Sequence, residues 1–125
     1  MRNVLFYAGP RARAHLREFG LRPQDIRVVP AAAGGPKGLV LNPLDRYIFG
    51  QWLAQTDQVV HLIGASIGAW RMACACLPDP AQALAQLAED YVTQRYPHRP
   101  GKLPVAQVVT EIFSAKIGED RKSVV

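Results

Sequence analysis

Residues 59–68 read Val59-Val60-His61-Leu62-Ile63-Gly64-Ala65-Ser66-Ile67-Gly68. The run begins with apolar residues typical of a buried strand, and the residues that continue to Leu77 are typical of a helix. A serine between small residues at a strand-to-helix turn is typical of a nucleophile elbow, because the turn excludes larger side chains and lifts Oγ out of the backbone. The stretch therefore predicts a strand, a tight turn at Gly64 and Gly68, and Ser66 as a nucleophile.

A second glycine cluster follows another apolar run, residues 27–33. A helix is expected to begin near residue 39 and to continue to about residue 54. Adjacent glycines leave backbone N–H groups uncovered and the lysine adds a positive charge, so this loop can bind an anion or an oxyanion. An ordinary strand-to-helix turn that needs glycine for its dihedral angles is the alternative. The loop consists of Gly34, Gly35, Pro36, Lys37 and Gly38.

The two glycine clusters are expected to lie close together. Each follows a predicted strand at its carboxyl end, where open α/β sheets bind their ligands. Residues 39–56 are long enough for one crossover helix, so strands at 27–33 and 59–65 are predicted to be parallel neighbours. A further strand is expected at residues 4–8.

On these residues the chain resembles the patatin-like phospholipases, a family of lipid acyl hydrolases. The oxyanion loop of that family reads G-G-G-x-[RK]-G; this chain has Ala33 in place of the first glycine and keeps Lys37 and Gly38. The family's G-x-S-x-G elbow is matched in full around Ser66. The resemblance covers about residues 27–77. It implies a three-layer α/β/α fold with a mainly parallel sheet, incomplete in this chain.

The resemblance also implies a Ser-Asp dyad that works without histidine. Ser66 attacks the carbonyl carbon of a lipid ester, and an aspartate acts as the general base. Backbone N–H groups of Gly34, Gly35 and Gly38 hold the oxyanion. The positive end of the following helix, with the N–H of Ile67, assists them. The family's aspartate lies in a D-G-[GA] motif downstream of the serine, whereas no aspartate of this chain precedes a glycine.

The last six residues match the in-frame translation of a common sequencing adapter; they read Asp120-Arg121-Lys122-Ser123-Val124-Val125. We therefore expect residues 1–119 to be the N-terminal part of one hydrolase domain and residues 120–125 to be a non-native tail. A natural basic tail is the alternative. On the first interpretation the general base lies beyond residue 119 and this chain alone is inactive, because a serine without its base is a poor nucleophile.

Composition indicates a soluble globular protein, with 49% hydrophobic and 20% charged residues. The apolar run at residues 4–8 is too short for a signal-peptide core, and no run reaches transmembrane length, so a cytoplasmic location is expected. The formal net charge is +5. An N-terminal arginine cluster favours peripheral contact with an anionic membrane surface, or is an ordinary solvated helix face. Aromatic residues do not alternate with these arginines as on a nucleic-acid surface, since Phe19 alone lies among them, so nucleic acid is not an expected partner. The cluster comprises Arg11, Arg13, Arg17, Arg22 and Arg27.

Neither a metal nor a cofactor is expected. Cys74 and Cys76 lie two apart on the predicted helix after the elbow, so their side chains diverge and cannot form a local disulfide. Other ligands at metal-binding spacing do not accompany them. We expect two free, buried thiols.

Further helices are expected on either side of the motif region. One covers residues 11–19 and is closed by Gly20; another opens with Asp79 as N-cap and Pro80 in its first turn. A proline-rich linker at 97–100 precedes a last amphipathic helix at 103–117.

Three other functions remain open at this point. An α/β-hydrolase esterase needs a Ser-His-Asp triad, and none of His15, His61 and His98 has a spacing that suggests a base. That fold also places more strands between its oxyanion loop and its serine than the 31 residues from Gly35 to Ser66 allow. A nucleotide-binding loop needs Ser or Thr after its lysine. A non-catalytic interaction module with an inert elbow is the third.

Overall fold

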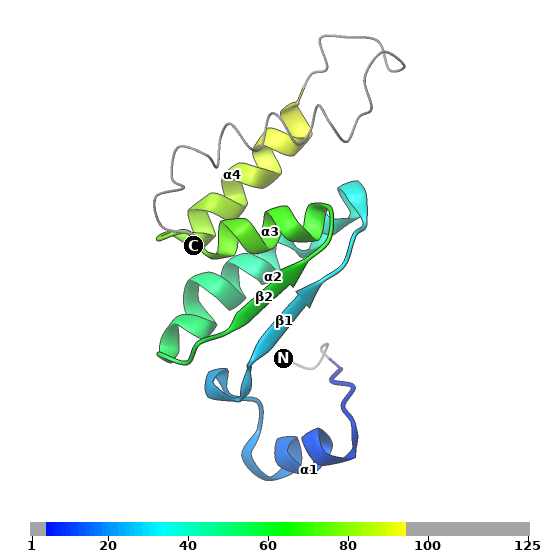
Figure 1. The fold of residues 1–125 in the computed structure, drawn as a ribbon, viewed down its shortest axis with the longest axis vertical. Helices are drawn as coiled ribbons and strands as arrows, with labels where there is room; N and C mark the ends of the chain where they lie inside the picture. Colours follow the sequence, from blue (N-terminus) through cyan, green and yellow to red (C-terminus); the bar gives the residue numbers. More distant parts are fainter. Residues whose placement is uncertain (1–4, 95–125) are drawn as a thin grey trace.

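The computed structural model describes residues 5–94, in which helices alternate with two strands (Figure 1). Four α-helices are α1, α2, α3 and α4; η1, η2 and η4 are 3₁₀ turns, and η3 is a π-helical turn. In chain order the elements are α1 (Pro10–Phe19), η1 (Pro23–Asp25), β1 (Val28–Ala31), η2 (Gly35–Leu41), α2 (Asn42–Tyr47), η3 (Ile48–Trp52), η4 (Leu53–Gln55), β2 (His61–Gly64), α3 (Ile67–Ala75) and α4 (Pro80–Thr93).

The two strands form a parallel sheet. Val28 of β1 lies opposite His61 of β2, and Ala31 lies opposite Gly64. Both strands therefore end at the same edge, and the glycine clusters that follow them begin at that edge. This confirms the predicted pair of parallel neighbours joined by a helical crossover, although each strand is shorter than the sequence indicated.

The prediction of a strand at residues 4–8 is wrong for residues 5–8, which the structure describes. Leu5 to Ala8 lie outside any strand, and the residues Leu5 and Tyr7 are 76% and 92% exposed. An extended segment forms a strand only where a neighbouring backbone pairs with it. Between residues 5 and 94 the sheet has only its two strands, and Val4 lies outside that range.

The crossover is not the single helix expected at residues 39–54. Helical structure begins four residues earlier, at Gly35, and passes through 3₁₀, α, π and 3₁₀ turns to Gln55. Pro36 and Pro43 have no N–H to donate, so neither supports a regular ladder of i to i−4 bonds. In the π turn, a Cβ on Gly50 would lie 2.9 Å from the Cβ of Ala81 in α4. The irregular backbone thus follows from its prolines and from the close approach of α4.

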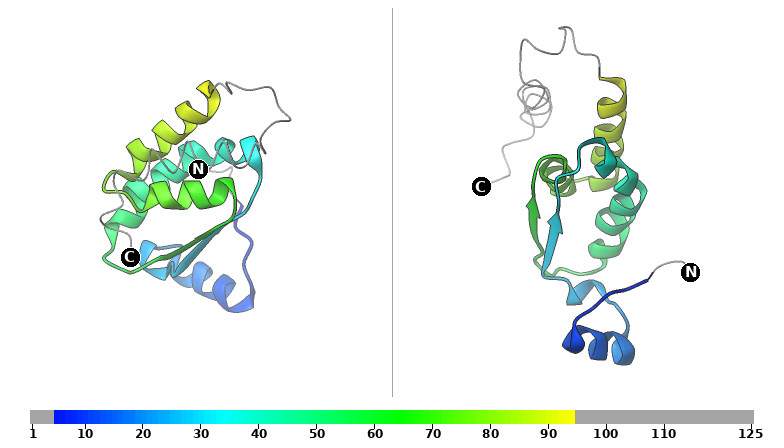
Figure 2. Two further views of the ribbon diagram at one scale, coloured as in Figure 1. Left: turned by 45° about the horizontal axis from the view of Figure 1, so that its top comes forward. Right: turned by 90° about the vertical axis from the view of Figure 1, so that its right-hand side faces the viewer.

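One face of the sheet carries the core. Val29 and Ala31 of β1 share this face with Leu62 of β2 and pack with side chains from the crossover, α3 and α4. In the right-hand view of Figure 2, α2 and α4 lie to one side of the two strands. On the opposite face Val28 and Ile63 are exposed. Residues 5–94 thus form a mixed α/β unit of two layers.

The predicted helix ends at Gly20 and Asp79 are confirmed. Gly20 takes φ 72 and donates its N–H to the Leu16 carbonyl, which closes α1. Asp79 accepts a hydrogen bond from the Gln82 N–H at 2.9 Å and caps α4. The linker at 97–100, the helix at 103–117, His98 and the tail at 120–125 lie outside the described residues.

Candidate active site

Ser66 occupies a tight turn between β2 and α3. The Ala65 carbonyl accepts a hydrogen bond from the Gly68 N–H at 3.0 Å, which closes a four-residue turn with Ser66 second. Ser66 has φ 54 and ψ −127. The corresponding position of a type II′ turn has φ of about +60° and ψ of about −120° and is normally glycine. In residues 5–94 Ser66 is the only non-glycine residue with positive φ.

Close contacts hold Ser66 in this conformation. A Cβ on Gly64 would lie 2.5 Å from the Ala69 backbone, and a Cβ on Gly68 would lie 2.3 Å from the Ala31 carbonyl oxygen. Both are backbone atoms, so neither glycine can carry a side chain without moving α3 or β1. A positive-φ serine costs on the order of 1–3 kcal/mol and persists only where its surroundings enforce it. As the sequence predicted, the turn follows a strand, precedes a helix and has no room for side chains at Gly64 and Gly68.

The hydroxyl of Ser66 is not used to cap α3. Serine at an N-cap usually accepts a hydrogen bond from an N–H of the first helical turn. Ser66 stands at that position, yet the structure of residues 5–94 gives its side chain no capping hydrogen bond. The residue is exposed at the surface, beside the positive end of the α3 dipole. Ser66 is therefore accessible from solvent.

The second glycine cluster begins a helix rather than a loop. Gly34 has φ −176 and ψ 1, Gly35 takes φ 54, and η2 starts at Gly35. The first N–H groups of a helix have no acceptor within it, and Pro36 has no N–H. The N–H groups of Gly34 and Gly35 are thus the candidate oxyanion donors of this turn. The Lys37 side chain is exposed beside them.

Gly38 brings the two turns into contact. It is buried, and a Cβ added to it would lie 2.8 Å from Cγ2 of Ile67. Ile67 is the first residue of α3, directly after Ser66, so its N–H precedes the helical ladder. Gly38 itself lies inside η2, and its absent side chain makes room for Ile67. The sequence proposed Gly38 as an oxyanion donor; the structure gives it this packing role as well.

The described histidines do not approach Ser66. His61 begins β2, whereas Ser66 follows the end of that strand, and the rise from His61 to Gly64 alone is about 10 Å. His15 Nε2 lies 3.1 Å from Asp25 Oδ2, and this contact with His15 lowers the pKa of that carboxyl group. This His–Asp pair joins α1 to η1 beside the starts of the strands, at the edge opposite Ser66 (Figure 1). A triad built on either histidine is not supported.

The arginine cluster also lies away from Ser66. Arg11, Arg13 and Arg17 are exposed on α1, which Figure 1 shows at the opposite end of the sheet from the elbow. A bilayer bound through α1 would therefore not face Ser66. Each helix between residues 5 and 94 is too short or too polar to cross a membrane.

The two cysteines differ. Cys74 is buried, and desolvation, followed by the charge of Asp90, raises the pKa of its thiol to about 11. Cys76 is exposed, so the expectation of two buried thiols is wrong for Cys76, which lies at the end of α3. No group of three His, Cys, Asp or Glu side chains within the described range is arranged to hold a metal.

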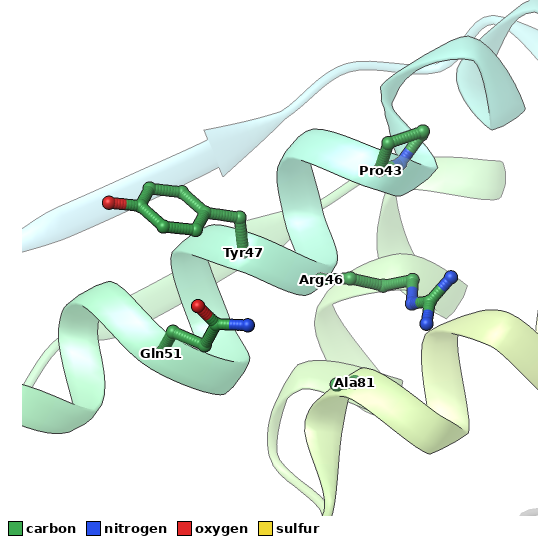
Figure 3. A pocket seen from close by; sticks show the side chains of 5 residues that line it. All are labelled: Pro43, Arg46, Tyr47, Gln51 and Ala81. Atoms are coloured by element: carbon green, nitrogen blue, oxygen red, sulfur yellow. The ribbon is translucent and has the colours of Figure 1, made fainter.

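A hollow of about 240 Å³ lies away from the elbow. Its lining residues are Pro43, Arg46, Tyr47, Gln51 and Ala81. In Figure 3 the Tyr47 phenol and the Arg46 guanidinium point in opposite directions, so they do not converge on one ligand.

Sequence reasoning missed one pair of residues behind the two turns. Asp45 of α2 and Arg71 of α3 form a buried ion pair. In the sequence each is an ordinary charged residue of a predicted helix, and no local signal marks either as buried.

In comparisons with known proteins, no family model, curated protein or solved structure matches this chain.

Proposed function

We propose that Ser66 is the nucleophile of a serine acyl hydrolase that cleaves lipid carboxylic esters, of the patatin-like phospholipase type. The observation that carries the proposal is the Ser66 backbone at φ 54 and ψ −127, where glycine would be unstrained. The proposal is also supported because Ser66 is exposed and its hydroxyl makes no capping hydrogen bond to α3. The complete fold is proposed to be the three-layer α/β/α arrangement.

In the proposed mechanism, Ser66 Oγ attacks the ester carbonyl carbon while its proton passes to an aspartate base. The carbonyl oxygen becomes an oxyanion, which accepts hydrogen bonds from the N–H groups of Gly35 and Ile67. One such donor is worth about 2.7–4 kcal/mol in a transition state of this kind. The tetrahedral intermediate expels the alcohol, which takes the proton from the aspartate. Water then hydrolyses the acyl-Ser66 ester by the same route.

The base is proposed to lie outside residues 5–94. Three aspartates within that range already have defined partners: Asp25 binds His15, Asp45 binds Arg71, and Asp79 caps α4. None of the three is followed by glycine, as the family motif requires. A lipid or simple ester is the proposed substrate, and no cofactor is needed for this chemistry.

The test is hydrolysis of p-nitrophenyl esters and of phospholipid by the protein expressed from its own gene. Ser66→Ala removes the attacking oxygen, so turnover should fall by about 10⁴- to 10⁶-fold. Thr93→Ala is the matched control, because it deletes a hydroxyl at an exposed residue of α4 that donates to the Glu89 carbonyl, and it should retain wild-type turnover. Hydrolysis by Ser66→Ala at near the wild-type rate would contradict the assignment.

The pH profile of kcat/KM separates the dyad from a Ser-His-Asp triad. A carboxylate base with an ordinary pKa near 4 stays ionised down to about pH 5, whereas a histidine base protonates below about pH 6.5. The proposed function predicts activity that persists at pH 5.5. Loss of activity with an apparent pKa between 6 and 7 would favour the α/β-hydrolase alternative.

A further inference from the structure

A buried ion pair joins the two helices that follow the two glycine turns. Arg71 of α3 donates from Nε to Asp45 Oδ2 at 2.6 Å and from Nη2 to Asp45 Oδ1 at 2.8 Å. The side chains of Arg71 and Asp45 are 8% and 6% exposed. Two parallel hydrogen bonds between planar groups fix the distance between the partners and also their mutual orientation.

Each partner belongs to a segment that carries one half of the candidate site. Asp45 lies in the first turn of α2, which continues directly from η2 and therefore from Gly35. Arg71 lies on α3, five residues after Ser66. These two segments already touch where Gly38 meets Ile67. The ion pair is a second contact between them, and two separated contacts restrain rotation as well as translation.

Stability alone does not distinguish this pair from an apolar one. Desolvation offsets much of the attraction between buried charges, and apolar side chains of similar volume are often as stabilising. An apolar pair, however, does not impose the directional register of two aligned hydrogen bonds. Acyl transfer needs such a register, because catalytic groups must be held within about 0.5 Å and a 1 Å misplacement can cost about 100-fold in rate.

We propose that Asp45 and Arg71 are positioning residues that hold the Gly34–Gly38 turn in register with Ser66. Neither contacts the substrate: they act through α2 and α3 on the donors at Gly35 and Ile67. The inference rests on the proposed function, because register matters where an oxyanion forms between the two turns.

The test replaces the ion pair by apolar side chains in the Asp45→Leu/Arg71→Met double variant. Two readouts are taken from the protein expressed from its own gene: kcat and KM for ester hydrolysis, and the NMR cross-peak between the Gly38 Hα and the Ile67 methyl protons. We expect a folded protein, KM within about twofold of wild type, kcat lower by about 100-fold and a weakened cross-peak.

Two matched controls separate register from general packing. Asn42→Ala removes the hydrogen bond from Asn42 Nδ2 to the Leu84 carbonyl, which joins α2 to α4 instead of α3. Its kcat per folded molecule should equal that of wild type. Arg46→Lys changes an exposed neighbour of Asp45 and should also leave kcat unchanged.

A double variant that keeps both the wild-type kcat and the cross-peak overturns the proposal. If that variant does not fold, Arg71→Lys decides, because it retains the charge but loses the bidentate geometry. Its kcat should fall about tenfold with KM unchanged, and an unchanged kcat overturns the proposal. If wild-type protein hydrolyses no ester, the proposed function fails, and the cross-peak alone then tests the role of the ion pair. Loss of the cross-peak in the double variant supports the register role, and its persistence there refutes that role.

Discussion

The two turns at the carboxyl edge of the sheet share one backbone feature, a residue with positive φ, but place different residues there. Each leads from a parallel strand into a helix, and each contains one residue at φ 54. The first turn uses Gly35, for which this conformation is unstrained, whereas the second uses Ser66, for which it is not. The fold thus has glycine available as the relaxed solution and still carries serine at the elbow. Serine at position 66 therefore costs the fold stability that glycine would not cost.

Adding a methyl group at Gly68 should have the largest effect on this comparison. The new Cβ in Gly68→Ala would lie 2.3 Å from the Ala31 carbonyl oxygen, so β1 and α3 must separate. We expect a loss of about 3 kcal/mol or more in the free energy of unfolding, measured with urea. Gly9→Ala is the control, because nothing lies within 4 Å of its Cβ; it should cost at most about 1 kcal/mol as a poorer N-cap. Equal losses in the two variants would refute the packed elbow.

A smaller effect is expected at the relaxed turn. Gly35→Ala meets no atom within 4 Å, so its cost comes only from placing a Cβ at φ 54. That cost should be about 1–2 kcal/mol in the free energy of unfolding. A neutral Gly35→Ala would show that the first turn does not need positive φ.

The opposite sign is expected at the strained turn. Ser66→Gly relieves a strain of about 1–3 kcal/mol, offset by about 0.5–1 kcal/mol for the greater freedom of glycine in the unfolded chain. The variant should therefore be more stable than wild type by about 1 kcal/mol, although it lacks the nucleophile. Ser66→Ala keeps the strain and should stay within about 0.5 kcal/mol of wild type. A destabilised Ser66→Gly would remove the case that serine is retained at a cost.

The smallest effect concerns the two thiols of α3, which report whether this helix stays packed. Burial raises the pKa of Cys74 from 9.0 to about 11, so at pH 8 a thiol reagent should modify exposed Cys76 at once and Cys74 only after unfolding. Cys74 should become reactive in Gly68→Ala but stay protected in Gly35→Ala. Because the raised pKa favours the neutral thiol in the folded state, its contribution to stability is complete below pH 9 and is lost between pH 9 and about 11. Immediate reaction of both thiols in wild type would contradict the packing of α3.

Much of this edge of the molecule could be predicted from the sequence. Glycine, serine and proline act locally, so the turn at Gly64 and Gly68, the cap at Asp79 and the close of α1 at Gly20 follow from single residues. Parallel pairing followed from two apolar runs and a crossover of suitable length.

The remaining features depend on contacts between distant segments. The irregular crossover is shaped in part by the approach of α4 to Gly50, and the run at residues 5–8 forms no strand because its backbone finds no partner there. Asp45 and Arg71 lie 26 residues apart, and only the folded chain shows that they pair. Local patterns therefore located the proposed nucleophile but not the residues that hold its helix in place.

Reaction of Ser66 with a fluorophosphonate tests the central claim most directly. The reagent should add to Oγ with loss of fluoride in the protein expressed from its own gene, giving one adduct by intact mass that peptide mapping places on Ser66. Ser66→Ala should give no adduct, and Thr93→Ala should react as wild type does. Absence of an adduct in wild type, or an adduct that persists in Ser66→Ala, would contradict the assignment of Ser66 as an activated nucleophile.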